Sequence, residues 1–233
     1  AEPEPTRTIW SPTAFLPDEG TLNLRTVDFG LWSLEYTLNP NVMLHGSMTV
    51  PIMNFSLLPG ARFAAELHEY VRVALDTHVG FWLLYPTTEV VLLLYGGAPA
   101  LTIGTRDFFL NISLLVYGAT VFTRDSAWDA TGAESQTWGD ETFLFLSPNI
   151  GGSLRISRRI KLNLELHAPA LLDAEGDTAW DFGKVWAFAY GVRIFGQRFY
   201  GDVSFVVPIF PGVMDILQFL PIGLPMINFG VQW

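Results

Sequence analysis

The chain has 233 residues, half of them apolar, and its 13 basic and 23 acidic residues give a formal net charge of −10. This acidic balance argues against a nucleic-acid-binding protein, because phosphate binding needs clustered Lys and Arg. The sequence contains no cysteine, so disulfides, thiolate metal sites and cysteine nucleophiles are excluded.

The length fits one domain of moderate size. The mean hydropathy is positive, which is unusual for a soluble domain with this many Gly and Pro residues. No run of about 18 consecutive apolar residues is present to form a spanning helix, and the longest apolar stretch, Val79 to Ile103, is interrupted by prolines. Since only helices and closed barrels satisfy their backbone groups in lipid, a membrane protein with this sequence is expected to be a β-barrel.

Residues 1–19 differ from the rest of the chain, because they are rich in proline and acidic residues. The segment has neither the basic region nor the apolar region of a secretory signal, so we interpret it as a mature N-terminus left after signal removal. An arbitrary fragment boundary is the alternative. We expect the segment to lie outside the barrel wall or to fold into one mouth of the barrel, with Trp10 and Phe15 as anchors.

From Gly20 onward the sequence alternates between apolar and polar residues with the period of a β-strand. The clearest signal is a hairpin around the turn residues Asn39-Pro40-Asn41. About twelve strands are predicted, over residues 22–25, 32–38, 42–50, 62–67, 71–81, 90–103, 110–116, 144–156, 160–167, 186–194, 199–207 and 225–233. A β-bulge is expected in the sixth of them, where Gly96, Gly97 and Pro99 interrupt the pattern.

The connections between these strands alternate in length along the chain. Short turns are predicted near residues 39–41, 68–70, 104–107, 157–159 and 196–198. Mostly longer loops are predicted near residues 51–60, 85–88, 123–141, 169–184 and 208–224, the last with a helical turn over 214–219. An up-and-down barrel has short turns at one end and long loops at the other, and a soluble sandwich has no reason to alternate in this way. The predicted fold is therefore an all-β, up-and-down antiparallel transmembrane barrel over residues 20–233.

One face of nearly every predicted strand is apolar, and the other mixes small, polar and charged residues. In a membrane barrel the second face lines the lumen, whereas in a soluble lipocalin-like barrel, the alternative, it faces water. The expected lumen residues are Arg25, Glu35, His45, Arg62, Glu66, Arg72, Asp76, His78, Arg155, Lys161, Glu165, His167, Arg193 and Asp202. Their nearly balanced charges favour ion pairs across a narrow or closed lumen over a pore lining of one charge character.

No pattern in the sequence points to catalysis or to a metal site. The lumen histidines lie on different strands without ligand spacing, and no Ser, His and orienting polar group are placed together as a barrel lipase would need. The acidic run 173–177 lacks the length and the final Glu of an EF-hand loop. We therefore expect no cofactor and no metal.

Three tryptophans fall in the predicted loops, where exposed tryptophan indicates contact with a protein partner, a lipid or another copy of the chain. They are Trp128, Trp138 and Trp180.

The final nine residues, Pro225 to Trp233, alternate strictly and end on an aromatic residue. Together with the repeated pattern over residues 20–233, this stretch resembles the closing strand of a Gram-negative outer-membrane β-barrel, and the chain resembles the small porin-like members of that class. The resemblance implies an outer-membrane location among lipid and lipopolysaccharide, with residues 1–19 as a periplasmic segment. It also implies that the barrel assembly machinery reads Phe229, Val231 and Trp233.

Three functions are compatible with these expectations. The first is a non-enzymatic structural or assembly component that binds partners, or a second copy of itself, through its tryptophan-bearing loops. The second is a narrow porin or channel for small solutes. The third, more distant, is a lipid-modifying barrel enzyme. Fold alone does not choose among them.

Overall fold

The computed structural model describes residues 7–27, 30–49, 54–84, 90–128, 134–173, 178–180, 184–210 and 223–233. The regular structure of these residues consists of β-strands. Within the same ranges, no helix is long and apolar enough to cross a membrane.

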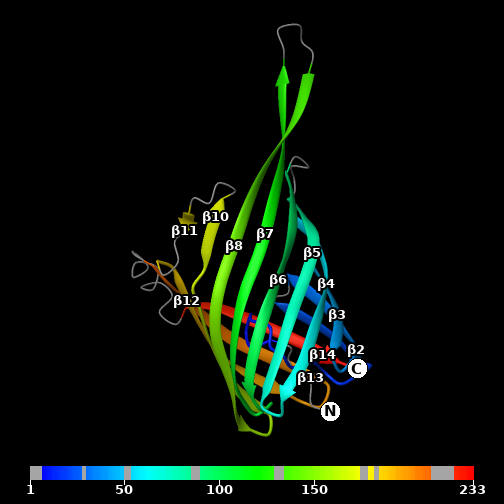
Figure 1. The fold of residues 1–233 in the computed structure, drawn as a ribbon, viewed down its shortest axis with the longest axis vertical. Coiled ribbons are helices and arrows are strands. Elements are labelled where there is room, and N and C mark those ends of the chain that lie inside the picture. The colour runs from blue at the N-terminus through cyan, green and yellow to red at the C-terminus, as the bar shows by residue number, and fades with distance from the viewer. Residues whose placement is uncertain are drawn as a thin grey trace.

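The strands form one antiparallel sheet (Figure 1). They are β1 (Leu22–Val27), β2 (Leu31–Asn39), β3 (Val42–Thr49), β4 (Asn54–His68), β5 (Val71–Leu84), β6 (Val90–Gly104), β7 (Phe108–Trp128), β8 (Glu134–Ser157), β9 (Ile160–His167), β10 (Ala170–Asp173), β11 (Thr178–Trp180), β12 (Trp186–Phe195), β13 (Phe199–Ile209) and β14 (Leu224–Gln232).

The sheet closes on itself because β1 pairs with β14, from Asn23 opposite Gln232 to Val27 opposite Asn228. The closed ring contains β1–β9 and β12–β14, which makes twelve strands in up-and-down order. The remaining two strands, β10 and β11, form a short extension on the early part of β8, above the stretch of β8 that pairs with β9. The prediction of an up-and-down antiparallel barrel of about twelve strands, within a range of 10 to 14, is confirmed.

The two faces of the wall have the polarity of a membrane barrel. On β2, Ser33, Glu35 and Thr37 are buried inside, while Leu34 and Leu38 are exposed outside. The other strands repeat this arrangement, so the exposed surface of the wall carries Leu, Ile, Val and Phe, and most of the buried side chains are polar. A soluble barrel would have the opposite polarity, whereas an apolar exterior suits hydrocarbon.

Three predicted loops are shorter than expected, because strands extend into them. Residues 54–60 belong to β4, and most of 123–141 belongs to the hairpin of β7 and β8. Part of 169–184 forms β10 and β11. In β4 the alternation disappears because apolar residues occupy both faces, with Leu57 exposed outside and Leu58 lining a cavity inside. In the distal part of the β7–β8 hairpin, which projects beyond the barrel, no hydrocarbon imposes alternation. The predicted loop at 85–88 and the helical turn at 214–219 lie outside the described residues.

The β-bulge expected in β6 is also absent, because β6 pairs with β5 from Ile103 to Val91 without a change of register. Gly96 has a different role. A Cβ atom on it would lie 2.6 Å from Cδ1 of Tyr117 on the neighbouring strand. The glycine therefore leaves room for an aromatic ring instead of bending the strand.

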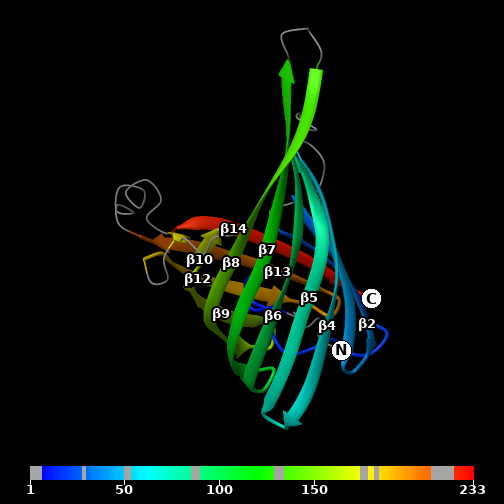
Figure 2. The ribbon, with the colours of Figure 1, turned by 45° about the horizontal axis from the view of Figure 1, so that its top comes forward.

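The β7–β8 hairpin extends far beyond the rest of the barrel (Figures 1 and 2). The two strands contain 21 and 24 residues, whereas a tilted strand needs about 9–11 residues to cross a bilayer. Their pairing continues as far as the described residues reach, to Trp128 opposite Glu134. The long-loop end of the barrel therefore carries a projecting ribbon.

A glycine of the closing strand gives a test of the lumen packing. The ring of Tyr200 is buried over Gly230, where an added Cβ would lie 2.3 Å from the Tyr200 Cζ atom, while an added Cβ at Gly46 meets nothing within 4 Å. Overpacking of this kind typically costs about 1–3 kcal/mol. Gly230→Ala should lower the unfolding free energy by that amount in urea titrations of the folded barrel in lipid vesicles, and Gly46→Ala should leave it unchanged. Equal stability of the two variants would contradict the packing.

Candidate functional site

The lumen is occupied by the chain's own N-terminal segment. Residues 7–17 run along the inside of the wall towards the end that carries the short turns, and Thr8, Ser11 and Thr13 on this segment are completely buried. We call residues 7–17 the plug. The composition of this segment predicts a place outside the wall or in one mouth of the barrel, but its described residues lie inside the barrel. Its contacts are made largely by backbone groups, which leave no pattern in a sequence.

One carboxylate of the wall holds the middle of the plug. Glu165 on β9 accepts backbone N–H groups from three consecutive residues, with distances of 2.7 Å to Ile9, 3.0 Å to Trp10 and 3.1 Å to Ser11. The same carboxylate lies 2.9 Å from Nε2 of His167. Because charge-assisted hydrogen bonds are stronger than neutral ones, this buried carboxylate is the main anchor of the plug.

Two carbonyl groups at the start of the plug accept hydrogen bonds from an arginine on β12. Arg193 donates to the backbone oxygens of Arg7 and Thr8 over 3.2 and 2.7 Å. Its guanidinium also makes two bonds of 2.6 Å to the carboxylate of Asp202 on β13. The ion pair joins neighbouring strands, and its remaining donors reach into the lumen to the plug.

A second buried carboxylate, Asp76 on β5, binds cations from the wall and from the plug. Arg62 on β4 donates to it through Nε at 3.1 Å and through a second, shorter bond. His45 on β3 contacts it through Nε2 at 2.7 Å, and Arg7 of the plug donates to it at 3.3 Å. Arg62 and Asp76 are almost completely buried, so each needs the other to offset the loss of hydration.

Pro12 and Ala14 of the plug are bound through neutral side chains of the wall. The backbone N–H of Ala14 donates to Oγ1 of Thr102, whose hydroxyl donates to Asn111, and Asn111 in turn donates to the carbonyl of Pro12. The ring of Phe15 packs edge-on against Phe109 with centroids 5.3 Å apart. Thr102, Asn111 and Phe109 were not among the predicted site residues. Thr102 and Asn111 could have been found from the sequence, because each lies on the polar face of a predicted strand.

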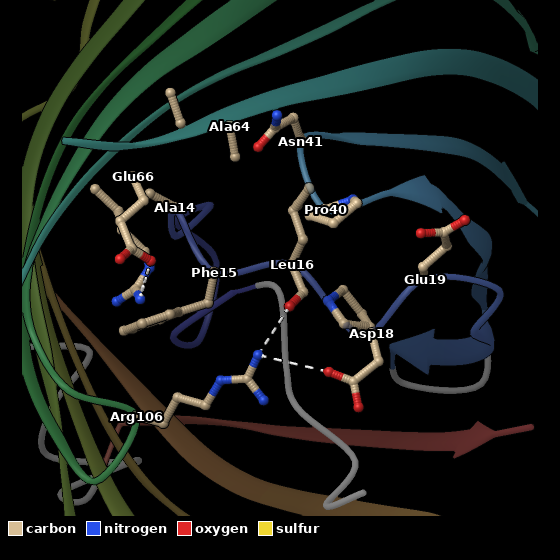
Figure 3. Close-up of a pocket in the computed structure, with 13 residues that line it drawn as sticks. Ala14, Phe15, Leu16, Asp18, Glu19, Pro40, Asn41, Ala64, Glu66 and Arg106 are labelled. Carbon is tan, nitrogen blue, oxygen red and sulfur yellow. Dashed lines mark hydrogen bonds and ion pairs between the residues drawn. The ribbon is translucent and has the colours of Figure 1, made fainter. Parts of the chain in front are cut away.

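The plug ends at the mouth of the barrel that carries the short turns (Figure 3). Arg106 reaches from the β6–β7 turn to the carbonyl of Leu16 at 3.3 Å and to Asp18 at 4.0 Å. A cavity of about 340 Å³ lies beside it, lined in part by Phe15, Pro40 and Arg72. The chain then turns at Gly20, which has a φ of 80°, and enters β1.

The other predicted lumen residues lie on the inner face at three levels. Glu66 and Arg72 pair at 2.5 Å at the mouth. Arg155 pairs with Asp107 at 2.5 Å near the same end, and the buried Lys161 lies 5.7 Å from the ring centroid of Phe195. Deeper in the barrel, Glu35 accepts a 2.9 Å bond from Asn23. Arg25 and His78 line a second cavity on the other side of the plug.

The ion pairs of the wall join residues of adjacent strands, of one strand or, for His45 and Asp76, of the two strands on either side of β4. The sequence pattern instead predicts pairs that cross the lumen. Antiparallel pairing places Arg62 directly opposite Asp76, and Arg193 opposite Asp202. Adjacent strands are about 4.8 Å apart, so neighbouring side chains meet first. Contact across the lumen is made through the plug.

The remaining predicted residues lie away from the plug. Trp128 and Trp138 belong to the projecting β7–β8 hairpin, and Trp180 belongs to β11. On β14 the exposed Phe229 faces outward with Val231, and the exposed Trp233 follows the strand. Across the described part of the chain, no group of three or more His, Cys, Asp or Glu side chains could hold a metal ion.

The anchoring role of Glu165 can be tested by amide exchange. Glu165→Gln replaces a charged acceptor of three buried N–H groups with a neutral one. Exchange at Ile9, Trp10 and Ser11 should become about tenfold faster or more, since a loss of about 1.4 kcal/mol corresponds to a factor of ten. Asp107→Asn, which breaks an exposed ion pair with Arg155 and removes no bond to Ile9, Trp10 or Ser11, should leave these rates unchanged. Unaltered exchange in Glu165→Gln would contradict the anchor.

The Asp76 cluster predicts a large difference between buried and exposed pairs. Asp76→Asn leaves Arg62 as an uncompensated buried charge and should reduce the unfolding free energy by about 3–5 kcal/mol. Glu66→Gln removes a carboxylate whose side chain is 56% exposed and should cost about 1 kcal/mol or less. Urea titration followed by tryptophan fluorescence would measure both. A loss of similar size in the two variants would show that Asp76 does not hold a buried pair.

Comparisons with known proteins add little to this description. No protein-family model matches the chain, and no curated protein does so significantly. Solved structures resemble it weakly over nearly its whole length. The NanC porin covers 91% of this chain and 97% of its own, with a TM-score of 0.42 and 8% identity. The CymD monoaromatic hydrocarbon channel covers 93% and 88%, with a TM-score of 0.41 and 11% identity.

LpxR from Salmonella typhimurium is similar to the same degree, with a TM-score of 0.41, 9% identity and coverage of 91% of this chain and 99% of its own. At these values the likeness carries no argument about function, so the function has to be inferred from the lumen and the surface of the chain itself. The closed antiparallel wall, the apolar exterior and the polar interior make the chain an outer-membrane-type β-barrel in fold.

Proposed function

We propose that this protein resides in the outer membrane of a Gram-negative bacterium as a non-enzymatic structural or assembly component whose resting lumen is closed by its own plug. The observation that carries the proposal is the set of hydrogen bonds between the plug and opposite parts of the wall. Glu165 on β9, Asp76 on β5 and Thr102 on β6 all bind it. A free solute path would require these contacts to break.

The strength of this closure follows from burial. The acceptors and donors that bind the plug are withdrawn from water, and leaving any one of them without its partner costs roughly 1–3 kcal/mol. Several such contacts break together when the plug leaves. Spontaneous opening is therefore rare, and a constitutively open porin is not the best account of this lumen.

The projecting hairpin supports a partner-binding role. Paired strands that extend past the membrane-crossing length present a rigid ribbon outside the bilayer. Trp128 and Trp138 belong to this ribbon and Trp180 to the nearby extension, where tryptophan suits a contact surface. The partners we propose are lipopolysaccharide, a protein, or a second copy of the chain. The barrel assembly machinery would act earlier, by reading Phe229, Val231 and Trp233.

A channel that opens only when the plug moves is the second proposal. It is favoured by the presence of cavities on both sides of the plug, of about 340 Å³ at the short-turn mouth and about 290 Å³ towards the long loops. Removal of the plug would join these spaces.

Planar-bilayer recording distinguishes the two proposals. The complete chain, refolded and checked by heat-modifiable gel migration, should give no steady openings, because the plug stays bound. Two variants should be compared with it, one lacking residues 1–17 and one carrying Glu165→Ala together with Arg193→Gln.

Silence of the complete chain and of both variants supports the structural component. Silence of the complete chain with openings in the variants supports the channel gated by the plug. Steady, salt-dependent openings of the complete chain would refute the closed lumen.

A further inference from the structure

A second cavity, of about 290 Å³, lies inside the barrel between the plug and the long-loop end. Its lining is contributed by β1–β7 and by the first described residue of the plug. We call it the vestibule, and its lining residues are Arg7, Arg25, Leu31, His45, Ser47, Leu58, His78, Leu94 and Tyr117. Its size is at the lower end of the range for small-molecule sites.

Two of its arginines have unsatisfied donors. The Nε atoms of Arg7 and Arg25 are both buried, and neither has a hydrogen-bond partner among the described residues. A buried donor without a partner costs about 1–3 kcal/mol, more when it is charged, so such groups in native proteins usually serve a ligand or an ordered water. Two arginines in this state at one small cavity indicate an anion.

The charge around the vestibule supports the same ligand class. None of its described lining residues is acidic. The nearest carboxylates are already engaged behind the lining. Asp76 accepts from Arg62, His45 and Arg7, and Glu35 accepts from Asn23. Glu35 is the main opposite charge near Arg25. The buried Nε of Arg25 still has no hydrogen-bond partner among the described residues, so this donor is left for a ligand.

Much of the remaining lining of the vestibule is apolar and aromatic. Leu31, Leu58 and Leu94 come from three different strands. The rings of His78 and Tyr117 lie together with centroids 4.6 Å apart and an interplanar angle of 32°. A bare inorganic anion would leave this surface without contacts, whereas a planar apolar body would fill it and pack against the His78–Tyr117 pair.

We propose that the vestibule is a binding site for a small aromatic carboxylate. The carboxylate accepts hydrogen bonds from Arg25 and Arg7, whose planar guanidinium groups match its geometry. The ring lies among the three leucines and against Tyr117. The site does not depend on whether the lumen conducts, because a ligand can occupy it with the plug in place.

Equilibrium dialysis of the complete chain in detergent micelles, with radiolabelled benzoate at neutral pH, tests the site. Saturable binding of one benzoate per chain is expected. Benzamide, which has the same shape without the charge, and acetate, which has the charge without the ring, should each compete at least about tenfold more weakly, since each lacks one half of the complementarity.

Two variants locate the site and one controls for charge. Arg25→Gln should weaken benzoate binding by about tenfold or more, as expected for loss of a charge-assisted bond. Tyr117→Leu removes an aromatic ring from the site. This variant should still bind both benzoate and hexanoate, but its preference for benzoate over hexanoate should be smaller. Arg158→Gln, at an exposed short turn on the opposite end, removes the same charge and should bind benzoate as the unaltered chain does.

Folding of each variant is verified by heat-modifiable migration and by the protection of the plug amides, so that a lost site is distinguished from a lost barrel. The proposal is overturned if the complete chain binds no benzoate saturably, if folded Arg25→Gln binds it equally well, or if benzamide or chloride competes as strongly as benzoate. Conductance recordings bear on the closed lumen alone, so the two proposals fail separately.

Discussion

The rest of the structure depends on the pairing of β1 with β14, because a sheet in hydrocarbon cannot leave an edge with unpaired backbone groups. Closure turns one face of every strand towards lipid and the other towards a confined interior. The outer face is then filled with Leu, Ile, Val and Phe, and the inner face collects the polar residues. The internal features of the molecule arise from how these inner polar side chains find partners for their charges and hydrogen-bonding groups.

A polar interior without much water has to pair its own charges. Adjacent strands do this first, as Arg62 with Asp76 and Arg193 with Asp202, because antiparallel register sets these side chains directly opposite one another. Such pairs leave part of their hydrogen-bonding capacity unused. The plug completes it: Glu165 takes three backbone N–H groups, and Arg193 gives two donors to backbone carbonyls. Lumen and plug are therefore one polar network, and each half would carry unsatisfied groups without the other.

The same network divides the interior into two different spaces. At the short-turn mouth, acidic and basic residues are paired, as Glu66 with Arg72 and Arg106 with Asp18. On the other side, Arg25 faces leucines and an aromatic pair, and the lining described there contains no carboxylate. This asymmetry distinguishes the proposed binding site from the general polarity of the lumen. Outside the bilayer, the β7–β8 hairpin gives the long-loop end a second specialised surface.

The sequence by itself determined a barrel of about twelve strands, each with one apolar and one polar face, because a half-buried strand records its environment in a period of two residues. It also placed Arg25, Asp76, Glu165 and the other charged residues on the polar face. It underestimated the β7–β8 hairpin, where no hydrocarbon imposes alternation, and it suggested a bulge where Gly96 makes room for Tyr117. Only the tertiary structure decided the occupant of the lumen, since residues 7–17 are held largely through backbone groups that any residue possesses. The tertiary structure also decided which charged side chains pair. Pairing depends on the register of neighbouring strands and on the distance between them, and the alternation of residues within one strand specifies neither.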